Sequence, residues 1–161
     1  MIRLIDLLKE SFSISLDDIE KVKANLTRPP YKSTINTKKK LEEIVDKFNK
    51  TIQKYIKGNT ITLYRAVAAD SKSDIDKTSF GIAWAAEEYF AQVYERDEEM
   101  SGMGLYLIIA DFKLDDINWK ETFESFIKFG FMETEIIVKN QPNHKSVPPI
   151  KFKIIKQGTF D

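Results

Sequence analysis

The stretch KGNTITLYRAVA, residues 57–68, marks the point at which the chain changes from helical to strand-like sequence. Before it the apolar residues recur at helical spacing, whereas after it they come in short β-branched or aromatic runs bounded by turn residues. Helices first and strands afterwards favour a segregated α+β fold over an alternating parallel one. We therefore expect an N-terminal helical layer packed on a twisted, mostly antiparallel β core.

Upstream of this stretch, the apolar spacing predicts helices at residues 2–12, at 15–26 and from about 33–37 onwards. The last of these is the longest, and we expect it to end at Gly58 and Asn59, which are typical residues just beyond a helix. Its predicted apolar stripe consists of Leu41, Ile44, Val45, Phe48, Ile52, Tyr55 and Ile56.

Downstream, the strands are recognised by β-branched and aromatic residues between turn signals. Residues 70–74 predict a polar loop, residues 86–96 a helix, and residues 113–123 a helical turn or short helix. The predicted strands are 60–68, 81–85, 105–112, 133–139 and 150–156.

Length and composition indicate a single domain over residues 1–161, with a helical portion at 1–58 and a β-rich portion at 59–161. Hydrophobic residues make up 42% and charged residues 31%, which is typical of a globular protein. The 25 basic residues balance 25 acidic ones. A net charge of zero gives no long-range attraction to a phosphate backbone, so no nucleic-acid partner is expected.

Residue usage also restricts the chemistry and the location. The chain has no cysteine, which excludes disulfides, thiolate metal sites and a cysteine nucleophile and suits a reducing cytoplasm. Its one histidine, His144, lies in a polar turn-like stretch, so no metal is expected. Asp6 and Lys9 interrupt the first apolar residues before a secretory signal builds up, and no run approaches the ~20 apolar residues that a membrane span needs. We expect a cytoplasmic protein that does not enter a membrane.

The strongest candidate constellation is the pair Glu133 and Glu135 at the start of the predicted strand 133–139. Residues two apart in a strand share a face. Crowded carboxylates are costly, so a protein that keeps such a pair next to β-branched residues can be using their charge. A solvated strand edge explains the same pattern and stays open as the alternative.

Arg65 is the second candidate, because strand alternation places its guanidinium on the same face as Leu63 and Val67. Arginine is rarely buried without a partner. Only four of the 25 basic residues are arginine, which suggests that Arg65 is used for its planar fork. Such a fork grips a phosphate or carboxylate through parallel hydrogen bonds. A structural ion pair inside the sheet is the alternative.

The third candidate is the segment 76–91, where the hydroxyls of Thr78 and Ser79 and the glycine Gly81 lead into the predicted helix. These hydroxyls could orient a ligand, and simple turn formation is the alternative. Trp84 and Trp119 are expected to pack in the core or at its rim.

The order of these three segments resembles the Arg-Ser-Glu class of ADP-ribosyltransferases. That class has an aromatic-Arg strand, a Ser-Thr-Ser strand followed by a helix, and an acidic strand after a mobile aromatic loop. The resemblance covers about residues 60–140, and phage-borne members that modify host proteins are of similar size, which would place the chain in a host cytoplasm. The matching residues are Tyr64, Arg65, Thr78, Ser79, Phe129, Phe131, Glu133 and Glu135.

The resemblance implies a protein mono-ADP-ribosyltransferase that moves ADP-ribose from NAD+ to a side chain of a target protein. Arg65 would hold the NAD+ diphosphate. Glu135 would hydrogen-bond the nicotinamide ribose and stabilise the positive charge that develops as the glycosidic bond breaks. Glu133 would orient the acceptor, and a glutamate there implies arginine as the acceptor.

The remaining resemblance residues would complete NAD+ binding. Tyr64 and Ser79 would line the dinucleotide site. Phe129 or Phe131, in the loop before the acidic strand, would stack on nicotinamide or on the target.

One departure from the class concerns the hydroxyl strand. If the helix after Ala86 sets the register, that strand falls on residues 81–83, which carry no hydroxyl. Either Ser79 reaches the site from upstream, or the chain is an impaired enzyme or a binding module, such as a phage inhibitor, that binds a partner protein. A further alternative is a structural phage component whose N-terminal helix docks on a larger assembly.

Overall fold

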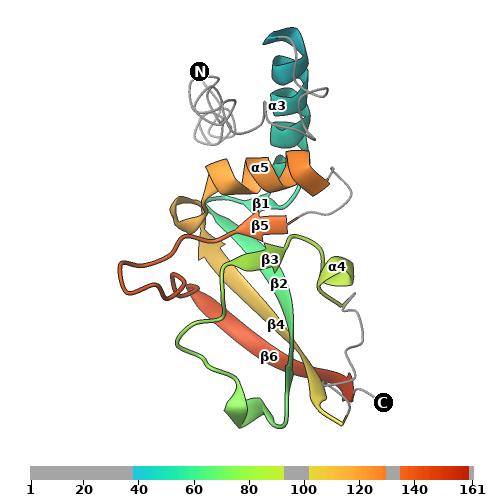
Figure 1. Ribbon diagram of the computed structural model, residues 1–161, viewed down its shortest axis with the longest axis vertical. Helices are drawn as coiled ribbons and strands as arrows, with labels where there is room; N and C mark the ends of the chain where they lie inside the picture. The colour runs from blue at the N-terminus through green and yellow to red at the C-terminus, as the bar shows by residue number, and fades with distance from the viewer. Residues whose placement is uncertain (1–37, 93–101, 130–134, 160–161) are drawn as a thin grey trace.

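The computed structural model describes residues 38–92, 102–129 and 135–159 (Figure 1). The helices predicted at residues 2–12 and 15–26 lie outside these residues, as do positions 93–96 of the helix predicted at 86–96. In the described part, an antiparallel sheet is combined with helices, so the predicted α+β class is confirmed.

The sheet has the strand order β5-β3-β2-β4-β6, and β1 pairs with β2 beside this path. All of these pairings are antiparallel. The longest ladder joins β2 and β4, from Thr60 opposite Lys113 to Ala69 opposite Gly104. The strands are β1 (Ile56–Lys57), β2 (Thr60–Ala69), β3 (Ala83–Ala85), β4 (Gly104–Lys113), β5 (Glu135–Ile137) and β6 (Lys151–Thr159).

The described α-helices are α3 (Lys38–Gln53), α4 (Glu88–Gln92) and α5 (Trp119–Phe129), with short 3-10 helices at Lys72–Asp74 and Leu114–Asp116. Figure 1 shows α3 and α5 at the β5 end of the sheet, and β6 at the opposite edge. The ring of Phe48 in α3 meets those of Phe123 and Phe126 in α5 edge-to-face, at centroid distances of 5.2 and 4.9 Å.

The core lies on one face of the sheet. Ile61 and Leu63 of β2 and Ile108 and Phe112 of β4 are completely or almost completely buried. The register sets Ile61 opposite Phe112, so strand alternation brings these side chains to the same face. Phe48 and Ile52 of α3 belong to the same cluster.

The prediction for the end of α3 was wrong, because the helix ends at Gln53 rather than at Gly58. Ile56 and Lys57 instead form β1 and pair with Ile61 and Thr60 across a two-residue loop. Gly58 has φ +63° in that loop, a conformation that glycine adopts without steric cost. The Tyr55 N–H donates to the Ile52 carbonyl at 2.9 Å and closes the last turn of the helix before the hairpin.

The prediction for residues 113–123 was incomplete. A 3-10 helix at Leu114–Asp116 comes first, and α5 then runs beyond Phe123 to Phe129. Asn118 precedes α5, and its side-chain oxygen accepts a hydrogen bond from the Glu121 backbone N–H at 3.1 Å, as an N-cap residue does. Phe129, predicted in a loop, is therefore the last residue of a helix.

Candidate functional site

The three strands that carry the predicted motif are neighbours in the sheet. Tyr64 and Arg65 lie in β2, the segment after Ser79 leads into β3, and Glu135 begins β5. Tyr64 pairs with Ala85, and Ala85 pairs with Glu135. Segments up to about 70 residues apart in the chain thus meet in one row of the sheet.

This register places Arg65 and Glu135 on opposite faces. Tyr64, Ala85 and Glu135 share one row, so their side chains project to the same side. Arg65 is the next residue after Tyr64 and projects to the other side, with the buried Leu63. The expectation that the guanidinium and the carboxylate line one cleft is therefore not met.

Arg65 is used inside the fold. Its Nη1 donates a hydrogen bond to the carbonyl oxygen of Ala83, and its Nε is buried without a hydrogen-bond partner. Gly81 lies against the guanidinium, because a Cβ there would be 3.0 Å from Arg65 Nη2. No ion pair to a carboxylate is found for Arg65 among the residues that the structure describes. The sequence left open a structural ion pair for Arg65. In the described residues, Arg65 instead links β2 to β3 through its hydrogen bond to the Ala83 carbonyl.

Glu135 is held by α5. Its Oε1 accepts a hydrogen bond from the Ser125 hydroxyl at 3.1 Å, and Ser125 is itself buried. Glu135 as a whole residue is partly exposed. Of the resemblance residues near it, Glu133 and Phe131 lie outside the described residues, as does the side chain of Phe129.

α5 also covers the outer edge of β5. The backbone N–H of Ile137 donates to the Thr122 hydroxyl at 2.9 Å, and its carbonyl accepts from the Asn118 N–H at 2.8 Å. Ile117 also forms an antiparallel bridge with Val138, so the segment that leads into α5 and the first turn of the helix together cover this edge next to Glu135.

The hydroxyls before β3 join two loops. The Ser79 hydroxyl accepts a hydrogen bond from the Ser146 N–H at 3.2 Å, and Lys145 Nζ donates to the Thr78 hydroxyl at 3.0 Å. Hydrogen bonds from the Thr78 hydroxyl and N–H lower the pKa of Asp76 below its ordinary value. Ser79 is thus engaged in loop contacts.

β3 itself offers no hydroxyl, since it consists of Ala83, Trp84 and Ala85. Trp84 is buried and donates from its indole N–H to the Gly81 carbonyl at 3.0 Å. Trp119 similarly donates to the Leu114 carbonyl at 3.1 Å. The prediction that both tryptophans pack in or beside the core is confirmed.

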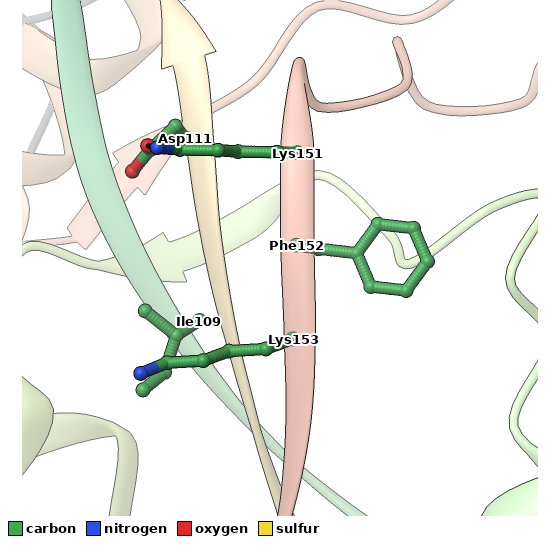
Figure 2. Close-up of a pocket in the computed structure, with 5 residues that line it drawn as sticks. All are labelled: Ile109, Asp111, Lys151, Phe152 and Lys153. Carbon is green, nitrogen blue, oxygen red and sulfur yellow. Dashed lines mark ion pairs between the residues drawn. The ribbon is translucent and has the colours of Figure 1, made fainter.

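A hollow that the sequence did not predict lies over the surface of the paired strands β4 and β6, with a volume of about 360 Å³. Its lining residues are Ile109, Asp111, Lys151, Phe152 and Lys153. Asp111 accepts a hydrogen bond from the Thr62 hydroxyl at 2.7 Å and pairs with Lys151 Nζ at 3.3 Å. Figure 2 shows Lys153 beside Ile109, while the Phe152 ring points to the other side of β6. The only sequence signal for this hollow was the pair Lys151 and Lys153, two residues apart in KFKIIK.

Comparisons with protein-family models, curated proteins and solved structures found no match to this chain. Within the described ranges, no group of three or more His, Asp and Glu side chains could hold a metal ion. Among the same residues, every helix is too short or too polar to cross a membrane.

Proposed function

We propose that this chain is a protein-binding module with an ADP-ribosyltransferase-like sheet and an impaired transfer site. The observation that carries the proposal is the register of β2, β3 and β5. In this register Arg65 and Glu135 project from opposite faces of the sheet. β3, the counterpart of the family's hydroxyl strand, carries Ala83 and Ala85 instead of hydroxyl residues.

Two physical requirements of the transfer reaction argue for impairment. A diphosphate needs an accessible guanidinium fork, whereas Arg65 has a buried Nε and an Nη1 that is bonded to Ala83. An oxocarbenium-like centre needs a carboxylate aimed at it from the same cleft that holds the nucleotide. With the two groups on opposite faces, one NAD+ molecule does not contact both.

The proposal is tested with NAD+ itself. Titration calorimetry with millimolar NAD+ should give no binding heat, and incubation with labelled NAD+ and a cell lysate should label no protein. Label transfer by the wild-type chain that disappears in Glu135→Ala would overturn the proposal. A matched control is Glu124→Ala, which removes a carboxylate of α5 that is not in the predicted site.

NAD+-dependent mono-ADP-ribosyltransfer to an arginine of a target protein is the second candidate. The adjacency of β2, β3 and β5 favours it, because the motif segments meet in one row, in which the partly exposed Glu135 and Tyr64 lie on either side of Ala85. In this function Glu135 stabilises the developing charge and Glu133 orients the acceptor. The same experiment decides between the candidates, since only the enzyme transfers label in a manner that depends on Glu135.

A further inference from the structure

The two edges of the described sheet differ. At one edge Thr122 of α5 and Asn118 just before it bond to the backbone N–H and carbonyl of Ile137. At the other edge, β6 pairs with β4 on its inner side only, and none of the residues at 38–92, 102–129 or 135–159 adds a strand to its outer side. An edge strand of nine residues presents a row of backbone donors and acceptors to another chain.

The side chains of β6 give this edge a positive charge. Lys151, Lys153 and Lys156 are exposed, and the strand has no acidic residue, although the whole chain carries no net charge. Lys151 pairs with Asp111, while neither Lys153 nor Lys156 forms an ion pair with a described residue. A segment with acidic side chains would therefore find oppositely charged neighbours along this edge.

Exposed apolar side chains lie between these lysines. Phe152 is 42% exposed and Ile155 is 38% exposed, on opposite faces of β6. Ile155 shares its face with Lys153 and the hollow floored by Ile109, and Phe152 projects from the other face (Figure 2). Both faces of the strand thus combine an apolar contact with a positive charge.

We propose that the outer edge of β6 binds an extended, acidic segment of a partner protein by strand addition. Backbone hydrogen bonds to β6 supply the affinity, and the lysines on the two faces of β6 select glutamate or aspartate on both faces of the partner strand. A second copy of this chain fits poorly, because pairing two β6 strands brings lysines of both copies into one sheet. The inference rests on the proposed binding function and names its surface and its partner chemistry.

Fluorescence anisotropy tests the proposal with a labelled peptide of about ten residues built from Glu-Glu-Val-Val repeats, which presents glutamate and valine on both faces of an extended strand. We expect saturable binding that weakens at higher salt. A peptide with lysine in place of glutamate should not bind. A peptide with proline at alternate positions, which removes the ladder N–H groups, should not bind either.

Protein variants locate the site. Lys153→Glu with Lys156→Glu should weaken peptide binding at least about tenfold, a loss of about 1.4 kcal/mol. The control is Lys120→Glu, one such charge reversal at an exposed position of α5, which should leave binding within about twofold. Hydrogen exchange of the wild-type chain should show new protection of residues 151–159 when the peptide is added.

Four results would overturn the proposal: no binding of the acidic peptide, equal binding of the lysine peptide, an unchanged affinity in the double variant, or protection away from β6. A stable dimer with β6 already protected would also overturn it, in favour of a second copy. Its failure is distinguishable from failure of the proposed function, because NAD+-dependent labelling is measured without the peptide and depends on Glu135 rather than on Lys153.

Discussion

Gly81 and Arg65 share a small space just before β3. Gly81 has φ +86°, in the region that favours glycine, and its Cα faces the guanidinium. The guanidinium is held in place by its hydrogen bond to the Ala83 carbonyl. Arg65 therefore acts as a positioning residue that joins β2 to β3, and Gly81 is the residue that makes room for it.

Gly81→Ala should lower the free energy of unfolding by about 1–3 kcal/mol, since it adds backbone strain and a Cβ that displaces the guanidinium. Urea denaturation measures the loss. Gly58→Ala is the matched control, because Gly58 also has a positive φ of 63° but open space around its Cα. An equal loss in the two variants would show that Arg65 moves aside at no cost.

The hydrogen bonds that lower the pKa of Asp76 also predict a pH dependence. A carboxylate whose folded pKa lies below its unfolded value of 3.8 stabilises the fold above that pH, and this contribution is lost as the pH falls below it. Asp76→Asn should therefore be less stable than wild type at neutral pH, and the difference should shrink near pH 3. Urea unfolding at both pH values measures it, with the exposed Asp115→Asn as control. A difference that is independent of pH would contradict the assigned role.

At the scale of elements, α5 contacts both the helical layer and the sheet. Its aromatic face packs on Phe48 of α3, and its polar face, with Thr122 and Ser125, contacts β5. The helix therefore connects the packing of the helical layer to the position of Glu135.

Thr122→Val should destabilise the protein by about 1–3 kcal/mol, because it leaves the backbone N–H of Ile137 buried without an acceptor while it conserves the side-chain shape. Chemical denaturation measures this effect. Thr51→Val in α3 is the control, since the Thr51 hydroxyl bonds to the Lys47 carbonyl at an exposed position and its loss should change stability by no more than about 0.5 kcal/mol. Equal effects would show that β5 does not need the α5 hydroxyl.

At the scale of the whole molecule, the two edges of the described sheet differ: α5 contacts the β5 edge, and the β6 edge carries exposed lysines. Lysines on an edge strand discourage pairing with further copies. Replacing Lys153 and Lys156 by threonine should therefore promote self-association, with no loss of folded structure. Sedimentation velocity over a concentration series measures it, and Lys120→Thr is the control. A double variant that stays monomeric over the same range would contradict this role of the lysines.

Local patterns predicted most of the elements. β2 and β4 were predicted to within about one residue, because their β-branched and aromatic runs sit between clear turn residues. α3 was predicted by its apolar stripe, yet its C-terminus was misplaced because β1 forms only through pairing with β2. α5 was predicted only as far as Phe123, and its residues 124–129 were missed, since this helix is stabilised by contacts with Phe48 and β5 that its own sequence does not reveal.

The sequence by itself determined the α+β class, most strand positions and the candidate residues, because periodicity and turn chemistry act over short distances along the chain. Only the tertiary structure decided that Tyr64 and Glu135 share a face while Arg65 turns away from both. The physical reason is that side chains alternate along a strand, so a register difference of one residue moves a side chain to the opposite face. That register depends on pairing between segments far apart in the chain, which no local pattern specifies.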